Sequence, residues 1–428
     1  MLAYDAAHPA VFFHADRATE RWNVIQGWQA ALDSGAGAQF LATHGNAGDY
    51  LVQAVLYQWL GELGVIMVQV CLALWSGWAV MRIALLLGLS ERAAAATAGL
   101  YLLLPHTLVF PHQLASEAIY LPLLVVSLEL VARAMIGGKA GAAGIGGAVL
   151  AGANLVRPIT MLWPAVVALL MARAGRWRAA AAHLLWALVP VLAWMSFVGA
   201  QTGHFGMGDS SRDVGHNLYQ RLARTSETLA PAQAAQVRQT YLNQGETGSL
   251  PPLRYLHFAC EHPGAFLRHS LRDVAVFFGK SGIERLSIDY LEVGGSDRRD
   301  LQRGDAGWRT HLEREGTWST LQFLWREQGT VLLISLAGAA LMVAFSLAAL
   351  AGIQVLWRGR RQLTSAQRGL ALLLVALPLY ILVFSQLVDA MQSRHRAPAE
   401  AALMLLAGLG VSKWRRGRRP DFAVAPVQ

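Results

Sequence analysis

The stretch GTVLLISLAGAALMVAFSLAALAGIQV, residues 329–355, contains no charged side chain. It is long enough to cross the apolar core of a bilayer, which takes about 20 residues of helix. The basic segment WRGRRQLTSAQR (357–368) follows almost at once. An apolar run with arginines at one end is typical of a membrane-spanning helix whose basic end stays in the cytoplasm. This pattern predicts the fold class, an all-α polytopic membrane protein.

The composition of the whole chain agrees with this class. Of its 428 residues, 54% are hydrophobic and 15% are charged, and the mean hydropathy is +0.36. A soluble globular protein carries about 25% charged residues. The net charge of +9 does not predict a nucleic-acid partner, because many of the basic residues flank apolar runs. The two cysteines, Cys71 in an apolar run and Cys260 in a polar region, predict no disulfide.

Apolar runs elsewhere in the chain bring the predicted number of spans to about nine. They cover residues 63–88, 92–112, 117–136, 141–156, 158–174, 179–199, 329–355, 368–387 and 397–412. The fourth and fifth of these are short and are separated by the polar break NLVRP. A broken hairpin or a re-entrant pair is therefore an open alternative for them.

Basic residues in the connections set the expected orientation, with the tail KWRRGRRP in the cytoplasm. The resulting alternation predicts five regions. They are an external N-terminal loop with interfacial helices (1–62), a first transmembrane bundle (63–199), an external, mostly helical domain (200–328), a C-terminal transmembrane bundle (329–412) and a cytoplasmic basic tail (413–428). Within the first region, YLVQAVLYQWLG (50–61) is too short to span and predicts a helix at the membrane surface.

The external position of residues 1–62 raises a question about translocation. No apolar span precedes this segment to carry it across the membrane. We expect either that a first transmembrane helix is missing from the chain or that a short N-terminal tail is translocated directly. The mass of the native product distinguishes the two.

Ionisable side chains from distant parts of the sequence are predicted to meet at the external face. They are Asp16, Asp49, Glu117, Arg157, Arg394, His395 and Arg396. Their convergence at one membrane interface indicates a functional site there. Most of them also have a plain structural interpretation. Asp16 can be a solvated surface acid, and Asp49 and Glu117 can stabilise helix N-termini. Arg157 and Arg394 can reach lipid headgroups.

Four stretches, in chain order, resemble the integral-membrane glycosyltransferases of the GT-C fold. The closest resemblance is to the bacterial branch related to protein O-mannosyltransferases (glycosyltransferase family 39) and to lipid A aminoarabinose transferases. The stretches are FHADRATERW (13–22), similar to an acidic motif in the first external loop, LLLPHTLVFPHQLASEAIYLPLLV (102–125), NLVRPITMLWP (154–164) and SQLVDAMQSRHRAPAEAALMLLAGLG (385–410). Two external stretches, GHNLYQRL (215–222) and EHPGAFLRHSLRDVAVFF (261–278), are also similar to this branch.

The resemblance implies a GT-C-like helical bundle that uses a polyprenyl-phosphate-linked sugar donor. Asp16 would be the catalytic base, with inversion at the sugar, and Arg157, Arg394 and Arg396 would bind the donor phosphate. Further residues would orient the substrates: Asp49, His112, Glu117, His395, Asn217 and Tyr219. No cofactor and no metal ligand is predicted, although relatives differ in their need for a divalent metal. Many relatives carry a second carboxylate after the first, where this chain has Arg17.

The expected location is the bacterial inner membrane, with the active site facing the periplasm. The partners are the lipid-linked donor, membrane lipid and an acceptor that is a protein, a lipid or a glycan. Two other classes stay open: a transporter or flippase for polyprenol lipids or sugars, and a non-catalytic membrane scaffold. A transporter would place its charges at midplane depth in a central cavity.

Overall fold

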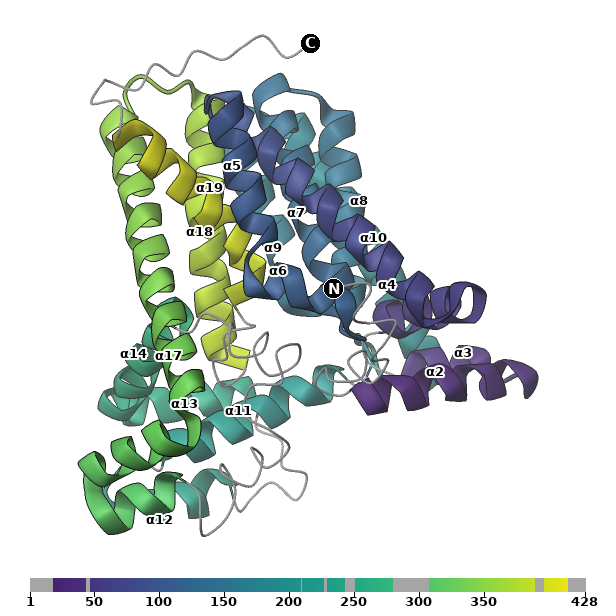
Figure 1. The fold of residues 1–428 in the computed structure, drawn as a ribbon. Coiled ribbons are helices and arrows are strands. Elements are labelled where there is room, and N and C mark those ends of the chain that lie inside the picture. Colours follow the sequence, from purple (N-terminus) through teal and green to yellow (C-terminus); the bar gives the residue numbers. More distant parts are fainter. Residues whose placement is uncertain are drawn as a thin grey trace.

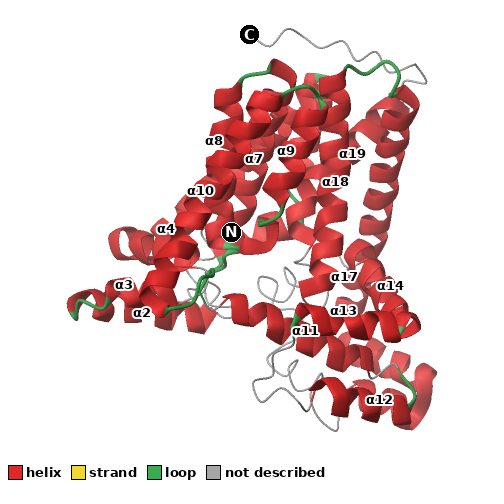
Figure 2. Ribbon diagram, turned by 180° about the vertical axis from the view of Figure 1, so that it is seen from behind, coloured by secondary structure: helices red, strands yellow, loops and turns green. Residues whose placement is uncertain are grey.

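The computed structural model of the chain describes residues 18–43, 47–208, 210–226, 229–242, 251–279, 308–388 and 396–414. Within these ranges every regular element is a helix and none is a strand (Figures 1 and 2). The long helices stand side by side as a bundle, and shorter helices lie at one end of it. The predicted all-α class is confirmed.

The bundle packs around one large core of buried apolar side chains. Its elements are α4 (Ala47–Leu86), α5 (Glu91–Leu102), α6 (Pro105–Val109), η2 (Phe110–His112), α7 (Glu117–Gly137), α8 (Ala140–Val156), η3 (Pro158–Thr160), α9 (Trp163–Arg173), α10 (Trp177–Thr202), α17 (Trp308–Gly359), α18 (Ser365–Val388) and α19 (Ala397–Trp414). Each apolar run that predicted a span coincides with helical structure, because hydropathy is a local property of the sequence.

The number of membrane crossings is only partly established by these helices. Among the described residues, five segments are long and apolar enough to cross a bilayer: Leu51–Leu86, Glu117–Gly137, Trp177–Thr202, Leu333–Gly359 and Ser365–Ser385. A sixth is formed if α5 and the α6–η2 pair count together as one bent span. The remaining apolar helices, α8, α9 and α19, are shorter. The predicted count of nine is therefore not confirmed.

The run predicted as one span over 92–112 is broken between α5 and α6. The two parts are bent by 65° at a short break. Pro105 stands in the first turn of α6, and Leu104 before it has extended backbone angles (φ −61°, ψ 139°). A proline lacks the N–H that would continue α5 and disfavours helical angles in the residue before it. The bend follows directly from this proline.

α4 joins the predicted surface helix (50–61) to the predicted first span in one element. The helix is interrupted at Gly61, whose backbone is non-helical (φ 67°, ψ −174°). A positive φ of this size strains residues with a Cβ but not glycine. Trp59, just before the interruption, is 80% exposed. The two predicted segments are thus parts of one helix with a kink.

The shorter helices lie at one end of the bundle, which we call the α11 end (Figure 1). They are α2 (Ala18–Asp33), α3 (Gly37–Thr43), α11 (Ser210–Ser226), α12 (Pro231–Val237), the π-helical turn η4 (Arg238–Leu242), α13 (Pro252–Glu261) and α14 (Pro263–Gly279). A small apolar core that includes Leu222, Tyr255 and Phe258 holds α11, η4 and α13 together.

A buried arginine connects three of these helices. Arg221 of α11 donates from Nε to the hydroxyl of Tyr255 on α13 (2.7 Å) and forms an ion pair with Asp273 on α14 (2.7 Å). His269, one turn before Asp273, lies 3.8 Å from the same carboxylate. Burial lowers the pKa of His269, so the neutral imidazole is favoured beside this ion pair. The imidazole therefore adds no full positive charge beside Arg221.

α17 begins well before the apolar run that predicted it. The run starts at residue 329, whereas the helix starts at Trp308, so the predicted domain boundary at 328–329 falls inside α17. Residues 308–328 include many polar and charged side chains, so hydropathy does not identify them as part of the same helix. Many of these residue types still favour a helix, so the chain stays helical beyond its apolar part.

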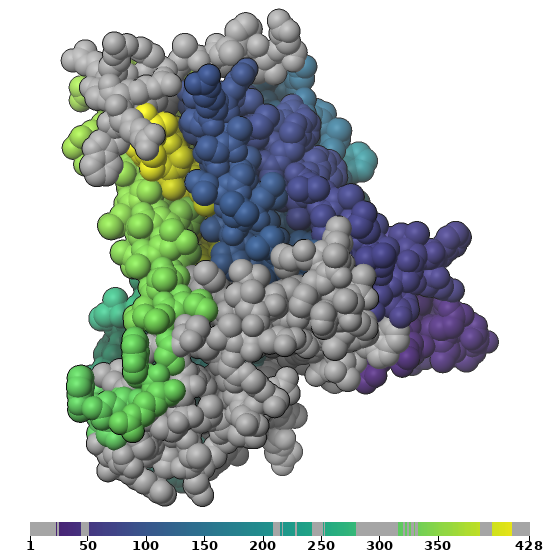
Figure 3. Space-filling view, viewed as in Figure 1, coloured from purple at the N-terminus to yellow at the C-terminus, as the bar shows by residue number. Residues whose placement is uncertain are grey.

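Glycines allow two pairs of bundle helices to approach very closely. A Cβ at Gly352 of α17 would stand 1.9 Å from the backbone oxygen of Leu406 on α19, and one at Gly147 of α8 would stand 2.3 Å from that of His183 on α10. Small residues at such crossings drive helix association in lipid, where the hydrophobic effect is weak. In Figure 3, α19 (yellow) is visible only as a narrow strip between α17 (green) and α5 (blue).

Gly352→Ala is expected to destabilise the bundle by about 1–3 kcal/mol, because the added methyl group meets rigid backbone and must push α17 away from α19. The matched control is Gly99→Ala in α5, where a Cβ has no neighbour within 4 Å. The control should be neutral or slightly stabilising. Thermal unfolding of both variants in one detergent measures the difference, and equal midpoints would show that the crossing tolerates a side chain.

Candidate functional site

The connection between α6 and α7 forms the centre of the candidate site. Residues 109–122 are buried without interruption, although they include the turn η2 and the non-helical residues after it. The side chain of Gln53 on α4 donates to the carbonyl of Ala115 in this connection (3.2 Å). Irregular backbone at membrane depth is tolerated where protein surrounds it, and it commonly lines functional cavities.

Glu117 and Arg157 form an ion pair at this connection. Glu117 lies in the first turn of α7, and Arg157 lies between α8 and η3 with extended backbone angles (φ −152°, ψ 111°). Nη1 of Arg157 donates to Oε1 of Glu117 and contacts the hydroxyl of Ser116 at 3.5 Å. The Glu117 side chain is 7% exposed and that of Arg157 is 20% exposed. The sequence predicted both residues at the external membrane face, from the order of the spans alone. The structure shows that they are in direct contact.

The loop that carries Arg157 is braced on both sides. Thr160 donates to the side-chain oxygen of Asn154 (2.8 Å), which closes the loop across Arg157. Tyr380 of α18 donates to the carbonyl of Ile159 (3.0 Å), and Tyr120 of α7 reaches Thr160 (3.4 Å). A functional side chain that stands on a braced segment loses little conformational freedom when it binds a ligand.

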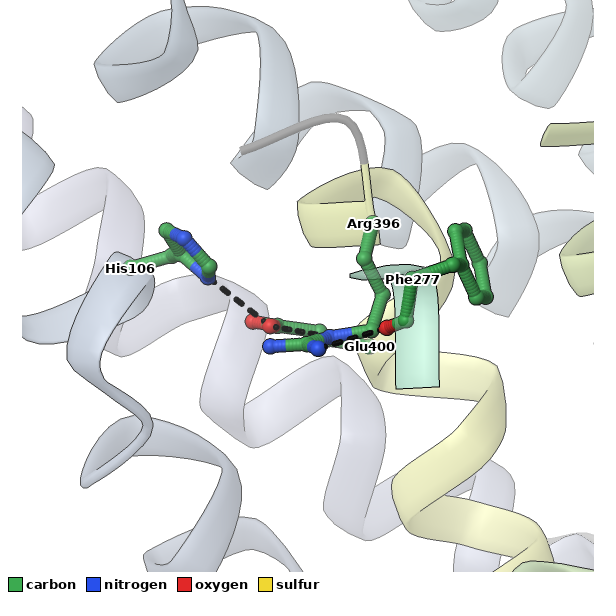
Figure 4. A network of polar contacts seen from close by, with 4 residues as sticks. All are labelled: His106, Phe277, Arg396 and Glu400. Atoms are coloured by element: carbon green, nitrogen blue, oxygen red, sulfur yellow. Dashed lines mark hydrogen bonds and ion pairs between the residues drawn. The ribbon is translucent and has the colours of Figure 1, made fainter. Parts of the chain in front are cut away.

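A second buried cluster joins α6, α14 and α19 (Figure 4). Arg396 donates from Nε to Glu400 (3.1 Å) and from Nη1 to the carbonyl of Phe277 in the last turn of α14 (2.7 Å). Nδ1 of His106 lies 2.8 Å from Oε1 of Glu400. An ionised carboxylate only accepts hydrogen bonds, so the proton of this contact belongs on Nδ1. All three ionisable side chains are buried.

This position differs from the one predicted for Arg396. A donor-phosphate ligand needs an accessible guanidinium, but Arg396 has no exposed surface and its charge is neutralised by Glu400. The sequence identifies the charge of a side chain and not its burial. In this arrangement Arg396 holds α14 and α19 together through Phe277 and Glu400.

A small cavity lies between the two clusters. Its volume is about 10 Å³, which is room for about one water molecule. Residues of five elements line it: Ser76 of α4, Tyr101 of α5, His106 of α6, Pro111 of η2 and Glu117 of α7 are among them. The Glu117–Arg157 pair and the cluster around Glu400 are therefore neighbours across one small cavity, which Glu117 and His106 both line.

The other predicted site residues have varied positions. His112 is buried in η2, and Asn217 and Tyr219 are half-buried on α11, where Tyr219 packs against the small apolar core. Asp49 lies in the first turn of α4, and its side chain is outside what the structure describes. Asp16, Arg394 and His395 are outside the described residues altogether. In the part of the chain that is described, no group of three or more His, Cys, Asp or Glu side chains could hold a metal ion.

Sequence reasoning missed Glu400 and the role of His106. The i,i+4 spacing of Arg396 and Glu400 was a readable signal for an ion pair on one helix face. His106 is 294 positions from Glu400, and no local pattern connects them.

Comparison with known proteins gives no relative that could assign the site. No protein-family model matches the chain, and neither a curated protein nor a solved structure is significantly similar to it. The arrangement itself is a partly exposed cation beside a carboxylate, on braced irregular backbone, at one end of an apolar bundle.

Glu400→Gln is expected to lower the stability of the bundle by about 3–5 kcal/mol, because it leaves the buried guanidinium of Arg396 without its counter-charge. The double variant Arg396→Met/Glu400→Gln should recover most of the loss, since both charges are then gone. Glu91→Gln, an exposed glutamate at the start of α5, is the control and should change little. Thermal unfolding in detergent is the measurement; a double variant less stable than Glu400→Gln would contradict this explanation.

Proposed function

We propose that this chain is a membrane glycosyltransferase. It transfers a sugar from a polyprenyl-phosphate-linked donor to an acceptor hydroxyl at the α11 end, with inversion at the sugar. The observation that carries the proposal is the Glu117–Arg157 pair, which holds a partly exposed guanidinium on braced, irregular backbone, with Glu117 lining a small cavity. The reaction class comes from the four sequence stretches that resemble GT-C glycosyltransferases.

Arg157 is suited to bind the phosphate of the donor. Its hydrogen bonds to described residues use Nη1 alone, and a guanidinium has five N–H groups in a planar fork. The remaining N–H groups of Arg157 can therefore donate to a phosphate oxygen, while the hydrogen bond to Glu117 keeps the guanidinium in place. The cation also stabilises the negative charge that develops on the phosphate as the sugar leaves. Arg394 is proposed as a second cation on the resemblance alone.

The chemistry needs one base and no general acid. The acceptor oxygen forms a bond to the anomeric carbon while the bond from that carbon to the phosphate oxygen breaks, and polyprenyl phosphate leaves with the electron pair. Asp16 is proposed to take the proton of the acceptor hydroxyl. Phosphate is a good leaving group, so the second carboxylate that glycoside hydrolases use as an acid is not required.

The proposed setting is the bacterial inner membrane, with the α11 end facing the periplasm. The helices α11 to α14 at this end would then stand where an acceptor arrives, and Asn217, Tyr219 and His395 are candidate substrate contacts. The acceptor is a protein, a lipid or a glycan hydroxyl. No cofactor is part of the proposed reaction, and a divalent metal is a variable to test by adding and chelating it.

The second candidate is a transporter or flippase for the same lipid class. Its supporting observation is a further charged cluster in the bundle, where Glu129 of α7 pairs with Arg82 of α4 (3.1 Å) and Arg133 (3.7 Å). A non-catalytic scaffold is the third. Purified protein incubated with a labelled lipid-linked sugar separates the transferase from both alternatives, because only the transferase releases free polyprenyl phosphate.

Asp16→Asn is expected to lower sugar transfer by about 100-fold or more, since the amide cannot accept the proton of the acceptor. The control is Asp33→Asn, an exposed carboxylate at the end of α2, which should retain activity. Both variants should insert into the membrane as the parent does. Transfer is measured as labelled acceptor and released polyprenyl phosphate; normal activity of Asp16→Asn would remove the base from the proposal.

Arg157→Gln is expected to raise the donor KM by about 10- to 100-fold, the value of one or two hydrogen bonds to a charged group. The acceptor KM should change much less. Arg133→Gln removes a guanidinium near Glu129 instead and should leave the donor KM unchanged. Initial rates over a range of donor concentrations measure this, and an unchanged donor KM in Arg157→Gln would assign the phosphate to other residues.

A further inference from the structure

Helix α14 has one face against the protein and a second, apolar face that is open. Ala265, His269, Asp273 and Phe277, four residues apart in turn, are buried. On the opposite side Leu267 and Leu271 are 58% and 60% exposed. A hydrophobic stripe of this kind on a helix that does not span the membrane indicates a contact with lipid or with another molecule.

The charges along this stripe are all positive. Arg268 and Arg272 follow the two leucines directly and are exposed. Among the described residues, neither arginine forms an ion pair with a carboxylate. Asp273 faces the other way, where Arg221 binds it. An apolar stripe with an arginine edge complements a layer of lipid headgroups, because the leucines enter the apolar boundary and the guanidinium groups meet the phosphates.

The position of α14 brings this face to the level at which the bundle ends. Its last turn is bonded to the start of α19 through Arg396 and the carbonyl of Phe277 (2.7 Å), and it lies beside α17 in both views (Figures 1 and 2). Leu271 and Leu267 precede Phe277 by less than three turns, no farther than about 9 and 15 Å along the helix axis. If α19 begins at the membrane surface and α14 runs close to the membrane plane, both leucines lie at the level of the headgroup layer, which is about 5–8 Å thick on each side of the bilayer.

We propose that the face formed by Leu267, Arg268, Leu271 and Arg272 lies on the membrane surface at the α11 end and binds anionic phospholipid headgroups of that leaflet. The contact holds α11 to α14 against the bilayer, in addition to the bond between Arg396 and Phe277. It does not depend on glycosyl transfer, so it can be tested without measuring activity.

The depth of this face in the bilayer is the first test. The full chain, with Cys71 and Cys260 replaced by serine, carries a spin label at Leu271→Cys and is placed in nanodiscs containing phosphatidylglycerol. The label should collide more often with oxygen, which concentrates in lipid, than with a water-soluble nickel complex. The control is a label at Gln236→Cys, an exposed position on α12, which should report water. A label at 271 that reports water as the control does, or is shielded from both reagents by protein, overturns the proposal.

The lipid preference is the second test and needs no label. Native mass spectrometry compares the binding of phosphatidylglycerol and phosphatidylcholine to the purified chain. Arg268→Gln/Arg272→Gln should reduce the preference for phosphatidylglycerol by about five-fold for each arginine. Arg238→Gln/Arg254→Gln removes two exposed arginines from η4 and α13 and should retain the preference. An equal preference in the α14 variant and the parent overturns the role of the arginines.

Discussion

A guanidinium without access to solvent needs a counter-charge close by, and Glu400 supplies it for Arg396. The carbonyl of Phe277 accepts a further hydrogen bond from Arg396, and His106 contacts the same carboxylate oxygen of Glu400 as Arg396 does. Because each partner belongs to a different helix, the need to neutralise one charge fixes α6, α14 and α19 relative to one another. The positions of α11 and α13 follow from this contact, since Asp273 of α14 binds Arg221 of α11, which in turn donates to Tyr255 of α13.

Two prolines interrupt the helices of the bundle and so help to form the candidate site. Pro105 separates α6 from α5, and Pro158 opens η3 after the extended Arg157. Both interruptions occur on the same side of the bundle, so the loop of Arg157 and the connection before Glu117 come together. The resulting ion pair is assembled from segments that are 40 positions apart. A site of this kind requires irregular backbone, because straight helices would have carried the two side chains along the bundle and away from one another.

The sequence predicted the helical class and the location of every apolar helix, because these depend on residues that are neighbours in the chain. The length of α17 was missed, since hydropathy ends at residue 329 while the helix extends back to Trp308. The pairing of Glu117 with Arg157 was not predicted as a contact, although both residues were expected on one face. Burial also explains why the predicted accessibility of Arg396 was wrong. In the sequence Arg396 is as basic as Arg157, and only the packing of α6, α14 and α19 shows that Arg396 is enclosed. Asp16, Arg394 and His395 stay predictions.

The interruption at Gly61 decides how α4 fits a bilayer of fixed thickness. The apolar stretch Leu51–Leu86 has 36 residues, which as a straight helix measures about 54 Å, far more than the hydrocarbon core of about 30 Å. Divided at Gly61, the longer part measures about 37 Å, which suits a tilted crossing, and the shorter part can take a different direction. A single residue without a side chain thus converts a helix that is too long for the membrane into one segment that matches its thickness and a second, shorter segment before it.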